Sequence, residues 1–408
     1  MRGAFLLLIA ATALLAGGAT SNASEFMTAQ GSALMLGGQE YRAIGVNVPH
    51  LHQIYMGTWF HLEQIYGTPE KARQAAIEAV LEAEKSGVAF IRFFASPGYP
   101  RDAAKLYLKD PDRYWRLMDE LFDFCRQHHV KLAPCLSAVL GWHLACGEPR
   151  QAILDPQSKT YQATYKYVQE FVSRYKNDPN VLMWELENEA FLVADLNMTG
   201  SQFPGLGIYP EGATAIREKG TREDSLTFAM LQELYRDLTA FIKSIDSNHL
   251  VTSGDADVRD CSESLRESFP NTVWKVDTLR QHLANLLASQ TEPLDVCSIH
   301  AYGPGEAAGR PGNLLALDYC RGLIRALHSA RSPVFVGELG NSNPSFQQDP
   351  AAKWTRSAID MLEKEGVALA AVWVWHFPWQ PELTVTRETH PLLARRIAQF
   401  NRKYAGLK

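Results

Sequence analysis

The sequence lacks several patterns that would assign it to other classes of protein. Its six cysteines include no Cys-x-x-Cys pair and match no zinc spacing. It contains no Gly-x-Ser-x-Gly, so a serine hydrolase with a nucleophile elbow is not supported. Neither sign of charge dominates, with 40 Lys+Arg against 45 Asp+Glu, and nothing indicates nucleic acid or an anionic membrane surface as a partner.

Long apolar runs are also scarce. The longest covers residues 4–16, follows the positive charge of Arg2 and is short for a membrane span. Small residues come next, and Ser21-Asn22-Ala23 is typical of a cleavage site. Residues 1–23 are therefore predicted to be a signal peptide, which directs residues 24–408 to the periplasm or the medium. Export permits disulfides, but the spacing of the cysteines does not reveal their pairing.

The chain does contain a regular alternation of strands and helices. Eight apolar runs have the character of buried parallel strands: residues 41–48, 88–94, 130–136, 181–188, 249–254, 294–301, 333–338 and 369–375. Amphipathic stretches separate most of them; one is expected to begin at Thr68 as N-cap and to end before Gly87. The alternation predicts an α/β fold with a single (β/α)8 TIM barrel.

Two segments stand outside this alternation. Residues 33–38 precede the first strand and are predicted to form a short N-terminal hairpin that closes the bottom of the barrel. Residues 196–220 are rich in Gly and Pro and show no apolar period, so a long loop bordering the cleft is expected there. No repeat or linker marks a second domain, and residues 24–408 are expected to be one catalytic domain and a monomer.

Two carboxylates follow apolar runs that are far apart in the chain. Glu189 ends the fourth predicted strand, directly after Asn188, and Glu338 ends the seventh, between Gly337 and Gly340. Barrel enzymes carry their chemistry at the carboxyl ends of the strands, so both side chains should meet at one rim. Glycoside hydrolysis needs two such carboxylates, a proton donor and a nucleophile, about 5 Å apart in a retaining enzyme.

Further polar and aromatic residues fall at the same rim. Arg92 lies inside an apolar strand and must find a carboxylate, since an unpaired buried cation is costly. Glu185 is interpreted as a structural partner in the barrel interior. The first strand ends at Asn47, and the sixth ends at His300 and Tyr302.

These motifs resemble glycoside hydrolase family 5, the cellulase and endo-β-mannanase family of clan A. The similarity extends from residue 41 to about residue 377 and includes Trp184-Glu185-Leu186-Glu187-Asn188-Glu189. It implies Glu189 as acid/base and Glu338 as nucleophile, with supporting residues Asn47, Arg92, Asn188, His300, Tyr302 and a sugar platform at Trp375. For that platform Trp373 is the alternative.

The resemblance also sets expectations for chemistry and substrate. Arg92 and Tyr302 are expected to keep Glu338 ionised, and the charge of Glu338 to raise the pKa of Glu189. Asn188 is expected to bind the sugar 2-hydroxyl. The strand-four motif is most similar to the endo-β-mannanase branches, so a secreted enzyme that cuts mannan or glucomannan in mid-chain is predicted. An endo-β-glucanase or cellulase is the alternative, since the third strand lacks the His of many members.

Two other classes of protein remain as alternatives. His50-Leu51-His52 follows the first strand, where metal-dependent amidohydrolase barrels carry a His-x-His pair, but strand five does not end in the required His. A non-catalytic sugar-binding barrel would be expected to lose one of the two carboxylates. No metal and no cofactor are expected, and the predicted partner is a polysaccharide or oligosaccharide.

Overall fold

A computed structural model describes residues 25–97, 101–136, 141–206, 216–290, 292–303, 316–330, 332–341 and 352–407. The predicted signal peptide therefore lies outside the described residues. Within them, no helix combines the length and the apolar character needed to cross a membrane.

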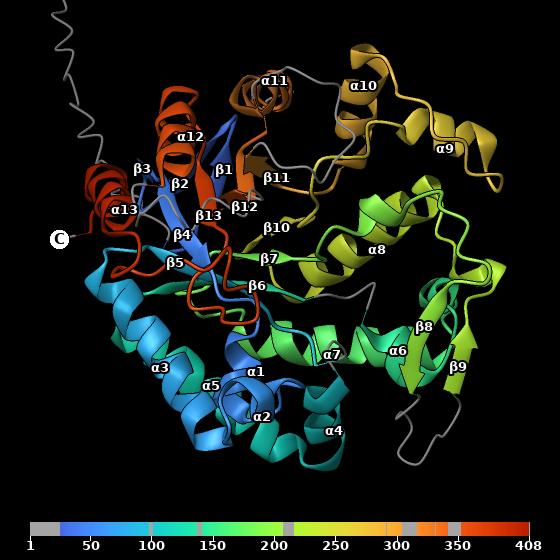
Figure 1. The fold of residues 1–408 in the computed structure, drawn as a ribbon, viewed down its shortest axis with the longest axis horizontal. Helices are drawn as coiled ribbons and strands as arrows, with labels where there is room; N and C mark the ends of the chain where they lie inside the picture. Colours follow the sequence, from blue (N-terminus) through green and yellow to red (C-terminus); the bar gives the residue numbers. More distant parts are fainter. Residues whose placement is uncertain are drawn as a thin grey trace, which may run out of the picture.

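Eight parallel strands form the centre of the molecule, as predicted (Figure 1). They are β4 (Ala43–Asn47), β5 (Phe90–Phe94), β6 (Lys131–Cys135), β7 (Met183–Glu185), β10 (Leu250–Thr252), β11 (Cys297–Gly303), β12 (Val334–Asn341) and β13 (Leu369–Val372). Neighbours in the sheet follow the order β10-β7-β6-β5-β4-β13-β12-β11, and a parallel bridge between Thr252 and Val296 joins its two ends. The (β/α)8 barrel is confirmed.

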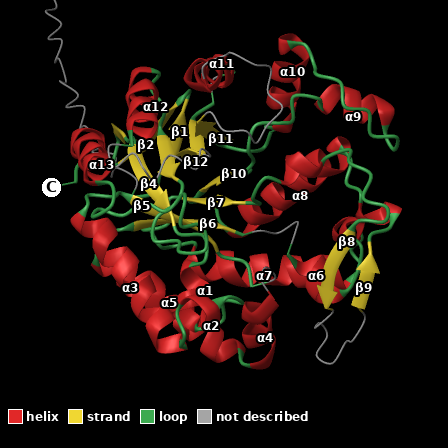
Figure 2. Cartoon of the chain, in the orientation of Figure 1, coloured by secondary structure: helices red, strands yellow, loops and turns green. Residues whose placement is uncertain are grey.

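Helices surround these strands in Figure 2. The main ones are α3 (Pro69–Lys85), α5 (Pro111–Gln127), α7 (Lys159–Tyr175), α8 (Phe228–Ile245), α10 (Leu279–Ser289), α11 (Ala316–Ser329), α12 (Lys353–Lys364) and α13 (Pro391–Tyr404). Shorter ones are α1 (Leu51–Met56), α2 (Leu62–Ile65), α4 (Arg101–Lys109), α6 (Trp142–Cys146) and α9 (Ser262–Ser268), with 3-10 turns at 150–154, 190–193 and 222–224. Thr68 caps α3 as predicted, accepting a hydrogen bond from Lys71 N at 3.3 Å.

The expected hairpin is part of a three-stranded antiparallel sheet, β1 (Thr28–Gln30), β2 (Ala33–Leu36) and β3 (Gln39–Glu40). Its buried side chains Met27 and Leu34 pack against residues at the beginnings of the barrel strands, such as Phe90 and Leu369. The sheet therefore closes the end of the barrel opposite the predicted catalytic rim, as expected.

The expected long loop at 196–220 is corrected by the structure. It contains two paired antiparallel strands, β8 (Gln202–Leu206) and β9 (Ile216–Lys219), at the lower right of Figure 1, and β8 contacts helix α6. All six cysteines are buried free thiols, so no disulfide stabilises the fold.

The last helix is tied to the first barrel strand by one side chain. Asn401 of α13 is fully buried; its Oδ1 accepts a hydrogen bond from Ile44 N at 2.7 Å. Its Nδ2 donates to the carbonyl oxygens of Ile44 and Gly87, both at 2.7 Å. One amide thus bonds three backbone groups, of which Ile44 O also accepts from Ala89 N at 3.2 Å.

Replacing Asn401 by Ala should lower the free energy of unfolding by about 3 kcal/mol, because Ile44 N and Gly87 O lose their side-chain partner and Ile44 O loses one of its two donors. Chemical denaturation of the variant measures this loss. Asn177→Ala, at an exposed position beyond α7, is the matched control and should change stability by less than about 0.5 kcal/mol. Equal stability of the two variants would contradict the assigned role of Asn401.

Candidate active site

A fully buried ion pair lies at the centre of the catalytic rim. Trp184 of β7 points to the helical layer, where its Nε1 donates to Asp246 at 2.8 Å, so Glu185 faces the barrel interior. There Glu185 meets Arg92 of β5: Nη2 lies 2.5 Å from Oε1, and Nε lies 2.9 Å from Oε2. The prediction that Glu185 is a structural partner is consistent with this placement.

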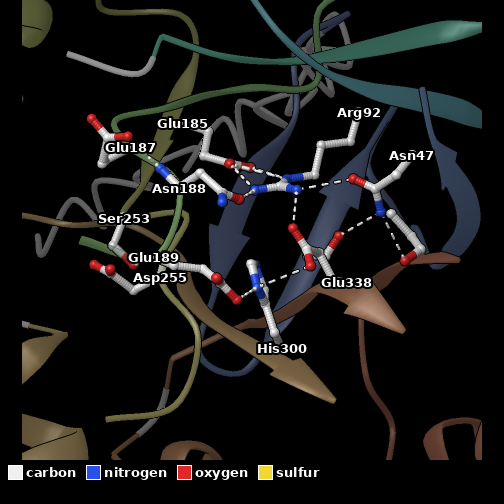
Figure 3. A network of polar contacts seen from close by, with 12 residues as sticks. Asn47, Arg92, Glu185, Glu187, Asn188, Glu189, Ser253, Asp255, His300 and Glu338 are labelled. Carbon is white, nitrogen blue, oxygen red and sulfur yellow. Dashed lines mark hydrogen bonds and ion pairs between the residues drawn. The ribbon is translucent and has the colours of Figure 1, made fainter. Parts of the chain in front are cut away.

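Arg92 also reaches three other predicted site residues (Figure 3). Its Nη1 donates to Asn47 Oδ1 at 2.9 Å and to Glu338 Oε1 at 3.0 Å, and its Nη2 donates to Asn188 Oδ1 at 2.7 Å. Asn47 in turn donates to the backbone oxygen of Gly337 at 2.9 Å. One guanidinium therefore joins the ends of four strands, β4, β5, β7 and β12.

Both oxygens of Glu338 are held. Oε1 receives Arg92, and Oε2 accepts a hydrogen bond from the Tyr302 hydroxyl, which comes from the neighbouring strand β11. Burial raises the pKa of Glu338. The positive charges of His300 and Arg92 and the hydrogen bond from Tyr302 oppose that rise and favour the carboxylate.

Glu189 follows β7 in a left-handed conformation, with φ 60° and ψ 30°, which is unusual for a residue with a side chain. Two residues after β10 support it. Gly254 O accepts from Glu189 N at 3.3 Å, and Asp255 Oδ1 accepts from Phe191 N at 2.9 Å. Gly254 has φ +77°, and a Cβ there would lie 1.9 Å from Glu187 O, so only glycine fits.

Sequence reasoning missed Gly254 and Asp255 as supports of the site. Their position at the end of the fifth strand was the available signal, since every barrel strand ends at the same rim. Asp255 is fully buried, and burial raises its pKa to about 7.

His300 lies between the two predicted catalytic carboxylates. Its Nδ1 is 2.8 Å from Glu189 Oε1 and 3.5 Å from Glu338 Oε2. Burial acts to lower the pKa of His300, but the two carboxylates outweigh it and the pKa is raised. Burial likewise acts to raise the pKa of Glu189, but the hydrogen bond and charge of His300 outweigh it, and the pKa is lowered. The expected raised pKa of Glu189 is therefore wrong, because the hydrogen bond and positive charge of His300 lower that pKa.

A carboxylate oxygen of Glu189 and one of Glu338 lie within 4.8 Å of each other, with Nδ1 of His300 in the same group. This matches the separation of about 5 Å found in retaining glycosidases and is shorter than the ~6.5–9.5 Å of inverting ones. The family model Cellulase (glycosyl hydrolase family 5) matches residues 58–377 of the chain. The chain belongs to glycosyl hydrolase family 5.

Solved structures of β-1,4-mannanases have the same fold as this chain. An endo-1,4-β-mannanase from Rhizomucor miehei is 15% identical with a TM-score of 0.63, and 93% of this chain and 99% of that chain are covered. An endo-β-1,4-mannanase from Thermotoga petrophila is 16% identical with a TM-score of 0.59, covering 91% of this chain and 78% of the other. A β-1,4-mannanase from the sea hare Aplysia kurodai is 16% identical with a TM-score of 0.54, covering 94% and 98%. A search of curated protein sequences gives no match.

The prediction of Trp375 as sugar platform is wrong. Its side chain is only 1% exposed, and its Nε1 donates to Ala79 O of helix α3 at 3.3 Å. Strand β13 ends at Val372, so the alternation of faces does not continue to Trp375. Trp373, the alternative, is partly exposed and borders the site: a Cβ placed on Gly340 would touch both its Cβ and the Tyr302 ring.

The amidohydrolase alternative is not supported in this family 5 chain. His50 is buried with its Nε2 2.9 Å from the Tyr66 hydroxyl, and His52 is also buried. Among the described residues, one group of potential metal ligands occurs, namely Glu189, His300 and Glu338. Arg92 places a fixed positive charge 3.0 Å from Glu338, which disfavours a second cation there.

Replacing Tyr302 by Phe should lower kcat/KM by roughly 100-fold, since the nucleophile loses an aligned donor. The hydroxyl lowers the pKa of Glu338, so its loss raises that pKa. Activity falls as pH drops through this pKa, and the acid limb should therefore move to higher pH. A pH profile of kcat/KM measures the shift.

A matched control is available for this variant. Tyr319 also donates to a buried carboxylate, Asp257, but outside the site, so Tyr319→Phe should leave the acid limb in place. An unchanged acid limb in Tyr302→Phe would show that the hydroxyl does not set the ionisation of Glu338.

Proposed function

We propose that the chain is a secreted, retaining endo-β-1,4-mannanase with Glu338 as nucleophile and Glu189 as acid/base. The observation that supports this mechanism is the placement of a Glu189 oxygen and a Glu338 oxygen within 4.8 Å, with Glu189 just after β7 and Glu338 inside β12. The choice of mannan is supported by the likeness to solved β-1,4-mannanases.

In the first step, a carboxylate oxygen of Glu338 attacks the anomeric carbon while the glycosidic oxygen leaves with a proton from Glu189. The product is a glycosyl ester of Glu338. Arg92 and Tyr302 hold the nucleophile in position before the reaction, so little rotational freedom is lost in the transition state. In the second step Glu189 removes a proton from water, which attacks the same carbon and releases Glu338.

His300 explains how Glu189 obtains its proton. The two side chains share one proton across 2.8 Å: either an imidazolium faces a carboxylate, or a neutral imidazole faces a carboxylic acid. A sugar that enters the site expels water, and loss of water disfavours the charged pair. This effect favours proton transfer to Glu189 when substrate binds.

Asn188 is suited to recognise the sugar 2-hydroxyl. Its Oδ1 accepts a hydrogen bond from Arg92, which fixes the amide and directs Nδ2 away from the guanidinium. Hydrogen bonds to the 2-hydroxyl strengthen in the transition state of glycoside hydrolysis, and the amide of Asn188 is placed to make one.

A cellulase or endo-β-glucanase of the same family is the second candidate, favoured by the description of the matching family model. Incubation with mannan, glucomannan, β-glucan, cellulose and xylan separates the two. We expect reducing sugar from mannan and glucomannan, with an early fall in viscosity because internal bonds are cut. Release confined to cellulose or β-1,3-glucan would refute the mannan assignment but not the family.

Glu189→Gln should lower kcat/KM on mannan by about 10²–10⁴-fold, since acid assistance is lost. A dinitrophenyl mannoside has a leaving group that departs without a proton, so formation of its glycosyl-enzyme should be almost unaffected. A burst of phenolate measures that step. Glu78→Gln, at an exposed position on α3, is the control and should behave as wild type on both substrates. Equal losses on both substrates would contradict Glu189 as the acid.

Export is part of the proposal and depends on residues 1–23. Mass spectrometry of protein recovered from the periplasm or medium should find a mature N-terminus near Ser24. Retention of an intact chain inside the cell would refute it.

A further inference from the structure

An exposed aromatic cluster lies at the catalytic rim outside the site described above. Trp379 stacks on His61, with ring centroids 3.5 Å apart and an angle of 19°, and Phe60 lies 3.9 Å from the same imidazole. Trp379 is 42% exposed and Phe60 is 50% exposed. Large apolar rings that face water in a contiguous group indicate a binding surface.

Buried rings connect this cluster with the catalytic site. Trp379 rests on the buried Trp59, with centroids 6.4 Å apart, and Trp59 lies 6.1 Å from Phe377. Phe377 lies 6.4 Å from Trp373, which borders Tyr302 and hence Glu338. The stack is therefore supported from below by buried rings that link it to Trp373 at the catalytic site.

The strand order places the cluster on one side of the bond to be cut. Phe60 and His61 follow β4, and Trp379 follows β13, and these two strands are neighbours. In the closed ring, β13 lies four strands from β7 in either direction, so the cluster lies across the barrel from Glu189. The acid/base Glu189 follows β7 and protonates the leaving group. The leaving group must therefore depart on the same side of the barrel as Glu189. The cluster consequently lies on the side of the sugar that is retained on Glu338.

We propose that Trp379, braced by His61 and flanked by Phe60, is a second sugar platform for units on the non-reducing side of the cleaved bond. A pyranose presents flat C–H faces, and stacking on an indole buries them without removing its hydroxyls from water. The His61 stack holds the indole plane in position, so little side-chain entropy is lost on binding.

This inference rests on the proposed roles of Glu189 and Glu338. It predicts whether the enzyme cuts inside a polysaccharide chain or removes single sugars from its end. An enzyme that removes single sugars from the non-reducing end leaves nothing to occupy a platform beyond Trp373. A second platform on the retained side therefore predicts that several units precede the cut.

The test is hydrolysis of reducing-end-labelled mannopentaose by wild type and Trp379→Ala. The wild type should release mainly short labelled products, since most units lie on the retained side. In Trp379→Ala the labelled products should become longer, and kcat/KM for mannopentaose should fall about tenfold. An aryl β-mannoside with one sugar does not reach the platform, and its kcat/KM should stay within about twofold of wild type. The tenfold loss on mannopentaose corresponds to about 1.4 kcal/mol for the platform.

Two further variants serve as controls. Trp379→Phe keeps a flat ring and should restore most of the wild-type cleavage pattern. Trp274→Ala removes a tryptophan that is 59% exposed between α9 and α10, and should leave the cleavage position unchanged. A purely structural role for Trp379 would lower activity on both substrates equally, with no change in the position of cleavage.

The outcomes separate this inference from the proposed function. If wild type cleaves mannan but Trp379→Ala gives the same labelled products, the platform is refuted and the mannanase stands. Release of mannose alone from the non-reducing end would likewise refute the platform. If wild type cleaves cellulose instead, the mannan assignment fails, and cellopentaose takes the place of mannopentaose in the same comparison.

Discussion

A single buried positive charge determines the arrangement of the whole catalytic rim. Arg92 is completely enclosed by the barrel, and an isolated cation there would be prohibitively costly. Glu185 neutralises it, and the remaining N–H groups require acceptors in fixed directions because the guanidinium is planar and rigid. Asn47, Asn188 and Glu338 supply them. The nucleophile is therefore positioned by the same network that makes the buried charge tolerable.

Much of the fold could be predicted because each barrel strand is buried on both faces and so forms an apolar run. The helix α10 escaped prediction because two of its leucines, Leu279 and Leu287, face solvent and obscure the apolar period. Its capping box, Thr278 with Gln281, was the signal that could have revealed it. The strands β8 and β9 escaped because their pairing is local and lacks a buried apolar face in the sequence pattern.

The site residues could likewise be predicted where they lie on regular strands, and not where the chain leaves them. Strand ends predicted the positions of Glu189, Glu338, Arg92, His300 and Tyr302, which all lie within one hydrogen-bonded network. Trp375 was misplaced because the chain leaves regular strand geometry after Val372, where alternation no longer determines direction. The lowered pKa of Glu189 could not be predicted, since it depends on which of two carboxylates His300 approaches more closely.

Asn401 has a consequence for the order in which the chain can fold. It completes the hydrogen bonds of the first barrel strand, yet it lies 357 residues after Ile44 in the chain. A ribosome adds about 5–20 residues per second, so the first strand waits many seconds for its last partner. Under the proposed export, such a delay would keep the chain unfolded while it crosses the membrane.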